Sequence, residues 1–350
     1  MRWLERVRSG PFAVAAGAVL AAALLGAVLL WAGGYDPLAA GHAAAMGAFG
    51  SRDALLSITL VRAVPLILTG LAVALAFRAG VWNVGAEGQL YAGAVAAVWV
   101  GLEGGSLPGW LLLPAVLVSA CVAGALWALA PALMKLRLGV GEVITTLLMS
   151  FVAIYLAAYM VHGPLQEPRG VFPQTGPIAE GARLPALVPG TRLHVGVVLA
   201  LVAAVALSWL FRRTRIGFQV RAVGASSEAA RIAGRIDTQK VVLVAFLGSG
   251  ALAGLAGGVQ VAGVTYALYE GLSPGWGYTA IAVALLAALN PLGVLATAIL
   301  FGALEAGAAA MQRDAGVPAV WAVAAQSLVI LAVLALDRAR RHAGPEASRV

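Results

Sequence analysis

Cysteine and histidine are scarce in this sequence of 350 residues. Cys121 is the single cysteine and lies inside an apolar run, which excludes an internal disulfide and a thiolate metal cluster. The four histidines are isolated, and no two have the spacing of paired metal ligands: His42, His162, His194 and His342. We therefore expect no metal site and no other cofactor.

Motifs that carry catalysis are also missing. No G-x-x-x-x-G-K-[ST] occurs, since neither Lys135 nor Lys240 has that context, so the chain hydrolyses no nucleotide through a P-loop. G-x-S-x-G and H-E-x-x-H are absent as well, and no pair of carboxylates suggests catalysis. The sequence predicts that the protein is not an enzyme.

Charge is sparse, whereas long apolar runs are plentiful. Charged residues make up 11% of the chain and hydrophobic residues 61%, with a mean hydropathy of +0.93. We expect an all-α polytopic membrane protein with about ten transmembrane helices, because backbone exposed to lipid must satisfy its own hydrogen bonds. The expected spans are residues 12–31, 54–77, 90–101, 110–134, 142–161, 193–211, 241–264, 276–289, 292–311 and 317–336.

The net charge of +8 arises from basic residues at the ends of these runs. They form no stripe with interleaved aromatics, so we expect no nucleic-acid partner. A cytoplasmic N-terminus places Lys135, Arg137, residues 212–240 and the basic tail on one side, as the positive-inside rule requires. We therefore predict a cytoplasmic N-terminus (1–11), one transmembrane domain (12–336) and a cytoplasmic tail (337–350).

The same threading places residues 163–192 outside. Six prolines stiffen this loop into extended turns, which suits a docking surface. Simple resistance to proteolysis is the alternative interpretation.

The basic segment 212–240 also carries helix signals. Thr214 can cap a short helix that Gly224 would end in a left-handed turn. Ser226 or Ser227 can cap a second helix, with Glu228 in its first turn and Gly234 at its end, and Asp237 or Thr238 can cap the next apolar run. These signals predict a folded cytoplasmic platform that meets a partner. A basic loop that only fixes topology is the alternative.

A few polar residues lie at membrane depth. Asn83, Glu87 and Gln89 cluster among glycines that permit a broken or tightly packed helix, so they can face a cavity. They can equally cap and pin that helix. Glu305 lies within an expected span and is open to the same two interpretations, while Glu142 is more simply a first-turn acid.

Two short patterns suggest an internal repeat. Residues 79–81 stand the same distance before Glu87-Gly88 as residues 262–264 do before Glu270-Gly271. The first copy follows a span that ends inside and the second a span that ends outside, as in a five-plus-five inverted repeat. Chance is a serious rival, because alanine, glycine and valine are abundant.

Four separated blocks of the sequence have a recognisable pattern: FRAGVWNVGAEGQ (77–89), VGEVITTLLMSFVA (140–153), GFQVRAVGASSEAARIAG (217–234) and IAVALLAALNPLG (281–293). They resemble the branched-chain/simple-sugar class of ABC-importer permeases. Within that class they are nearest to the larger permease subunit of general nucleoside importers. The resemblance runs from about residue 61 to residue 336, although Ala287, Ala288 and Leu289 stand where related chains tend to be more polar.

The resemblance implies an inner-membrane subunit that translocates a nucleoside and performs no chemistry. It also implies three partners: an ABC ATPase on the cytoplasmic side, a second permease subunit (a shorter paralogue or a second copy), and an extracytoplasmic substrate-binding protein. Coupling to the ATPase would fall on Gly217, Phe218, Arg221, Ala222, Gly224, Glu228, Ala229, Ala230 and Gly234. The substrate pathway would involve Asn83, Glu87, Gln89 and Glu305.

Two alternatives remain open at this point. The same importer class also carries pentoses and hexoses. An ion-coupled secondary transporter would need a proton or ion site, for which Glu87, Glu142 and Glu305 are the candidates.

Overall fold

In a computed structural model of the chain, the described residues are 11–232, 236–318, 320, 321, 324, 327, 328 and 331. They form helices and loops, with no strand among them and only two isolated β bridges. The chain divides into two compact units, residues 1–62 with 300–350 and residues 63–299. Each unit is described by itself.

The first unit contains α2 (Pro11–Ala32), α3 (Pro37–Phe49), the π-helical η1 (Ala54–Thr59) and the end of α13 (Pro291–Asp314). No helix was expected between the spans at 12–31 and 54–77, where α3 lies. Asp36 accepts hydrogen bonds from the backbone of Leu38 (2.8 Å) and Ala39 (3.3 Å), and Pro37 occupies the first helical turn. This N-cap starts a helix that hydropathy alone does not indicate.

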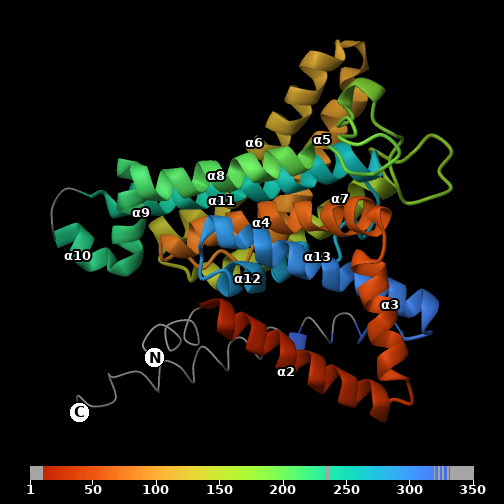
Figure 1. The fold of residues 1–350 in the computed structure, drawn as a ribbon. Helices are drawn as coiled ribbons and strands as arrows, with labels where there is room; N and C mark the ends of the chain where they lie inside the picture. Colours follow the sequence, from red (N-terminus) through yellow and green to blue (C-terminus); the bar gives the residue numbers. More distant parts are fainter. Residues whose placement is uncertain are drawn as a thin grey trace, which may run out of the picture. The chain divides into compact units, whose positions relative to one another are not determined.

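The second unit is built on three helices, α5 (Ala86–Glu103), α6 (Gly109–Leu138) and α11 (Thr238–Gln260) (Figure 1). Small residues allow them to approach closely: a Cβ added at Gly93 would overlap the backbone of Gly254, and one at Gly124 would overlap that of Gly250. Close backbone approach through small residues is typical of helix packing in membranes. This core positions the N-terminal turn of α5.

Other helices of this unit surround the core: α4 (Leu60–Arg78, which begins in the first unit), α7 (Glu142–His162), α8 (Gly196–Arg213), α9 (Arg215–Ala225), α10 (Ser227–Ile232), α12 (Trp276–Leu286) and the first part of α13. Short 3₁₀ turns lie at η2 (Gly104–Ser106) and η3 (Glu180–Ala182), and α11 continues into the π-helical η4 (Val261–Thr265). The expected spans between residues 54 and 311 thus all contain a helix.

Six helices of the described chain are long and apolar enough to cross a membrane: Ala54–Arg78, Gly109–Leu138, Glu142–His162, Gly196–Arg213, Thr238–Thr265 and Pro291–Asp314. Trp276–Leu286 is apolar but shorter. The expected count of about ten is therefore not confirmed. The span expected at 317–336 lies largely outside the described residues, as do the cytoplasmic segments expected at 1–11 (apart from residue 11) and 337–350.

The inverted repeat is also not confirmed. Glu87 lies buried in the first turn of α5, whereas Glu270 lies in a loop with its side chain 58% exposed. Residues 79–81 follow the end of α4, while residues 262–264 lie within η4. The two sequence patterns therefore occupy different local structures.

The proline-rich loop and the basic segment lie at opposite ends of the second unit (Figure 1). The loop packs along the chain that follows α11: Thr175 donates to Leu268 O (2.8 Å), and Ile178 donates to Tyr266 O (2.8 Å). At the other end, α9 and α10 project beyond the helices that flank them (Figure 1).

Candidate functional site

The polar turn before α5 is held by a closed set of hydrogen bonds. Asn83 Nδ2 donates to Gln89 Oε1 (3.0 Å) and to Ser249 Oγ on α11 (2.9 Å). Gln89 Nε2 donates back to Asn83 Oδ1 (3.2 Å), which also accepts from Gly85 N (3.0 Å). Asn83 is 0% exposed and Gln89 is 1% exposed. These amides therefore pin the start of α5 to α11.

Glu87 lies beside them and reaches a different helix. Its Oε2 accepts a hydrogen bond from Gly277 N (2.6 Å) at the start of α12, and the hydroxyl of Ser273 also bonds this carboxyl group. A carboxylate is favoured at a helix N-terminus because it satisfies free N–H groups and complements the helix dipole. Tyr91, one turn along α5, accepts from Ser273 N (3.1 Å). Glu87 thus clamps the first turn of α12 to that of α5.

Glu305, the fourth residue expected along the pathway, belongs to the first unit, whereas Asn83, Glu87 and Gln89 belong to the second. Its Oε2 lies 3.9 Å from Arg62 Nη1, and Arg62 also donates to the Glu305 carbonyl (3.4 Å). The Glu305 side chain is 11% exposed. Within this unit Glu305 therefore pairs with Arg62.

The basic segment folds as the capping pattern predicts at three points. Thr214 Oγ1 accepts from Gly217 N (3.0 Å) at the start of α9. Ser226 Oγ accepts from Ala229 N (3.2 Å) at the start of α10, and Asp237 Oδ1 accepts from Lys240 N (3.1 Å) at the start of α11. Backbone and side-chain hydrogen bonds from Lys240 hold the pKa of Asp237 below its usual value. The platform is therefore a pair of capped short helices.

The prediction for Gly224 is wrong. It does not end α9 in a left-handed turn, because α9 continues to Ala225 and Gly224 has no positive φ. A Cβ at Gly224 would instead overlap the carbonyl oxygen of Arg78 and lie 3.1 Å from Gly80 N. Glycine is required here for close approach of α9 to the turn that follows α4.

The remaining coupling candidates divide into buried and exposed positions. Gly217 and Ala230 are buried, and a Cβ at Gly217 would overlap the carbonyl of Leu210. Arg221 and Ala222 are half-buried. Phe218 is 59% exposed, and Glu228 and Ala229 are exposed on α10. Gly234 lies outside the described residues.

Sequence reasoning missed several partners of these residues. Glu142, interpreted as a first-turn acid, also forms a 2.6 Å ion pair with Lys135 and accepts from Trp82 N (3.4 Å). Ser150 Oγ accepts from Gly88 N (3.2 Å), and Thr146 Oγ1 accepts from Val84 N (3.2 Å). The sequence did hold a signal for these contacts, because Glu142, Thr146 and Ser150 recur every four residues and so share one face of α7.

The chain is similar to known permease proteins of transport systems. A family model described as "Branched-chain amino acid transport system / permease component" matches residues 55–336. A glucose ABC transporter permease protein of Haloferax volcanii is 40% identical, over 93% of this chain and 87% of its own length. No solved structure matches the chain significantly.

Two further relatives are named for nucleosides. A guanosine ABC transporter permease protein of Bacillus subtilis is 37% identical, over 86% of this chain and 86% of its own length. A nucleoside ABC transporter permease protein of Lactococcus lactis subsp. cremoris is 32% identical, over 84% of this chain and 83% of its own.

Proposed function

The chain belongs to the family of branched-chain amino acid transport system permease components, the membrane subunits of ABC importers, and on that premise we propose that it moves nucleosides into the cell. The observation that carries the assignment to an importer is the family match over residues 55–336. Proteins of this family are transporter subunits of the inner membrane and are not themselves catalytic. In this proposal a separate nucleotide-binding subunit hydrolyses the ATP.

The choice of nucleosides rests on relatives. Relatives of 37% and 32% identity are named for guanosine and nucleosides, and each covers more than four-fifths of the chain. Competition for uptake tests the choice: unlabelled guanosine should block entry of labelled nucleoside, whereas glucose and ribose should not. Block by the sugars at equal concentration would contradict it.

A simple sugar is the second candidate, and one observation favours it. The glucose permease of Haloferax volcanii is 40% identical to this chain, which is slightly above the nucleoside relatives. In the same assay, a sugar substrate would appear as saturable uptake of labelled glucose that excess guanosine leaves unchanged.

We assign residues 1–11 and 337–350 to the cytoplasm, residues 12–336 to one permease domain, and residues 163–192 to the outside. The placement of the proline-rich loop and of α9 and α10 at opposite ends of the second unit supports this threading. The basic residues in the last turns of α6 and α8 then face the cytoplasm. The external loop would receive the substrate-binding protein, and a second permease subunit would complete the pathway.

The coupling surface consists of Gly217, Phe218, Arg221, Ala222, Gly224, Glu228, Ala229, Ala230 and Gly234. Two features of the described part support it: Phe218 is 59% exposed on a short helix, and Glu228 is exposed on the next. An exposed aromatic side chain is typical of a residue that a partner protein covers.

Movement of this surface would reach the pathway through the turn that follows α4. Gly224 packs against Gly80 and the carbonyl of Arg78, and Asn83 lies three residues further along. Asn83 in turn bonds Gln89 and Ser249. A push on α9 would therefore shift the hydrogen-bonded start of α5, and Glu87 would transmit the shift to α12. Asn83, Glu87 and Gln89 would in this way shape the pathway.

Phe218→Ala and Glu228→Ala test the coupling surface. Truncating a central, desolvated anchor costs ~2 kcal/mol or more, so Phe218→Ala should weaken binding of the ATPase about thirtyfold and lower its co-purification. Val171→Ala is the matched control, because Val171 is 67% exposed in the loop at the opposite end. Full retention of the ATPase by Phe218→Ala and by Glu228→Ala would mean that the basic segment 212–240 only fixes topology.

A further inference from the structure

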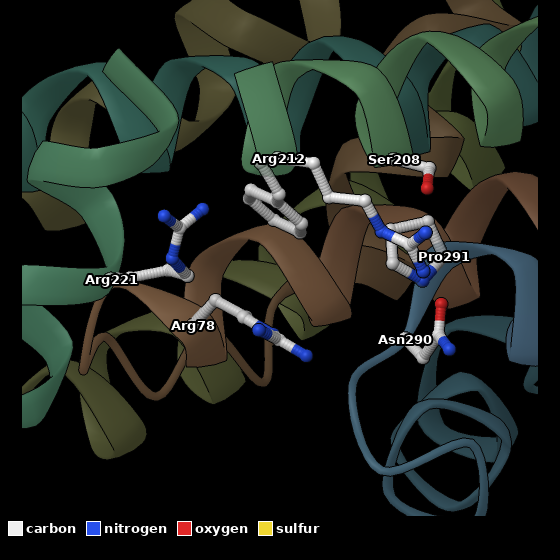
Figure 2. A pocket seen from close by; sticks show the side chains of 7 residues that line it. Arg78, Ser208, Arg212, Arg221, Asn290 and Pro291 are labelled. Carbon is white, nitrogen blue, oxygen red and sulfur yellow. The ribbon is translucent and has the colours of Figure 1, made fainter. Parts of the chain in front are cut away.

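A cavity of about 330 Å³ lies beside α9 in the second unit, where α4 and α8 end and α13 begins (Figure 2). Three of its lining residues are arginines from three different helices: Arg78, Arg212 and Arg221. Figure 2 shows the side chains of Arg78 and Arg212 extending toward the turn at Asn290 and Pro291. The proposed coupling role accounts for Arg221 alone.

The charge of this cavity is not neutralised by the described part of the chain. No carboxylate lines it, and none of the ion pairs between described residues includes these three arginines. The positive charges of Arg212 and Arg221 repel that of Arg78. Arg78 and Arg221 are half-buried and Arg212 is exposed, and three like charges gathered around one open space favour an anionic ligand.

Arg78 is held in place from two sides. Its Nε donates to Leu289 O (3.1 Å), and its guanidinium lies 5.5 Å from the centroid of the Phe211 ring. These contacts use one N–H of the guanidinium and one of its faces, so the terminal N–H groups are still able to bind a ligand. A guanidinium orientated in this way is suited to bidentate binding of a phosphate group.

The first turn of α13 adds to the positive potential. Pro291 is the first residue of this 24-residue helix, and Asn290 Oδ1 accepts from Leu292 N (3.2 Å). Both Asn290 and Pro291 line the cavity. The positive end of the α13 dipole therefore faces the same space as the arginines.

The position of the cavity indicates where the anion comes from. It lies at the ends of two candidate spans, α4 and α8, and at the start of a third, α13. Trp209 lies one turn before Arg212 on α8 and is 61% exposed. Exposed tryptophans are enriched at the headgroup level of a bilayer, which favours a position of this cavity at the depth of lipid phosphates.

We propose that this cavity binds the phosphate group of an anionic phospholipid from the leaflet around the ends of α4 and α8. Basic pockets between spans on the cytoplasmic side are known to take such headgroups. A lipid bound there would contact both α8 and the coupling helix α9. The inference depends on the chain being embedded in a membrane, and it is independent of the substrate and of the ATPase partner.

The test measures lipid binding to the full-length protein purified in detergent, by native mass spectrometry. The probes are phosphatidylglycerol, phosphatidylcholine and inorganic phosphate. Phosphatidylglycerol should bind most tightly, and Arg212→Gln and Arg221→Gln should each weaken it about fivefold, the effect of one basic residue near an anionic surface. Arg213→Gln is the matched control, since Arg213 is an exposed neighbour on α8 that does not line the cavity.

Three results would overturn the proposal. Equal binding of phosphatidylcholine would remove the requirement for an anionic headgroup. An equal loss in Arg213→Gln would indicate general surface charge. Inorganic phosphate that displaces phosphatidylglycerol at comparable concentration would indicate a site for a soluble anion. Arg212 is exposed, so its replacement should preserve folding, which circular dichroism verifies.

Discussion

Substitution of Gly224 tests whether α9 acts on the turn after α4. A Cβ at this position would overlap the Arg78 carbonyl oxygen, lie 2.9 Å from the Arg78 carbonyl carbon and lie 3.1 Å from Gly80 N. All three are backbone atoms, which cannot turn aside as a flexible side chain can. Ordinary carbon contacts begin near 3.5 Å, so α9 would have to move by on the order of 1 Å.

Overpacking of this kind typically costs 1–3 kcal/mol, so we expect Gly224→Ala to destabilise the α9 contact by roughly 2 kcal/mol. The expected result is reduced ATP-dependent uptake with normal membrane insertion. Gly41→Ala is the matched control, because Gly41 also lies in a helix and nothing is within 4 Å of its added Cβ. That variant should be neutral or slightly more stable, since alanine favours helix.

The order of two variants separates this account from a helix-ending role. If Gly224 ended α9 in a left-handed turn, asparagine would be tolerated better than alanine. If close approach is the constraint, the larger asparagine must be worse than alanine. Uptake by Gly224→Asn that equals wild type and exceeds that of Gly224→Ala would refute the contact argument.

Three further predictions concern topology, the polar turn and a strained loop. In a Cys121→Ala background, a membrane-impermeant thiol reagent should label Val171→Cys from outside and leave Ser227→Cys unlabelled; the reverse pattern would invert the threading. Glu87→Gln removes the charge that Gly277 N contacts, and a hydrogen bond to a charged group contributes roughly 1.5–3 kcal/mol, so transport should fall by about tenfold or more. The control Glu103→Gln, at the exposed end of α5, should leave transport unchanged. Unchanged transport in Glu87→Gln, Asn83→Ala and Gln89→Ala would place the pathway elsewhere. Ala288 has a φ of 50°, so Ala288→Gly should raise the free energy of unfolding by about 1 kcal/mol, whereas Ala39→Gly in α3 should lower it by a similar amount. A lower melting temperature for Ala288→Gly would contradict the assignment of strain.

Local signals in the sequence predicted the helical architecture and the caps. Thr214, Ser226 and Asp237 each bond a backbone N–H three residues ahead, which a single sequence reveals because both partners lie within one turn. The hydropathy pattern likewise located the helices between residues 54 and 311. It missed α3, since that helix depends on the Asp36 cap and has no long apolar run.

Contacts between distant segments could not be predicted. Glu87 and Gly277 are 190 positions apart, and Asn83 and Ser249 are 166 apart. A single sequence does not record which of its buried polar residues meet. Gly224 shows the same limit, because its neighbour Gly80 belongs to another part of the chain, and glycine was attributed to a local turn instead. The departure from the family pattern at Ala288 and Leu289 was visible, and both residues adopt positive φ.

The energy source for uptake tests the central claim most directly. Labelled guanosine uptake would be measured in cells that carry this chain with its ATPase and binding protein, and in matched cells without the chain. Uptake that stops on ATP depletion and survives collapse of the proton gradient by an ionophore is the predicted result. Uptake that survives ATP depletion and stops with the ionophore would contradict an ATP-driven importer and would indicate ion-coupled transport.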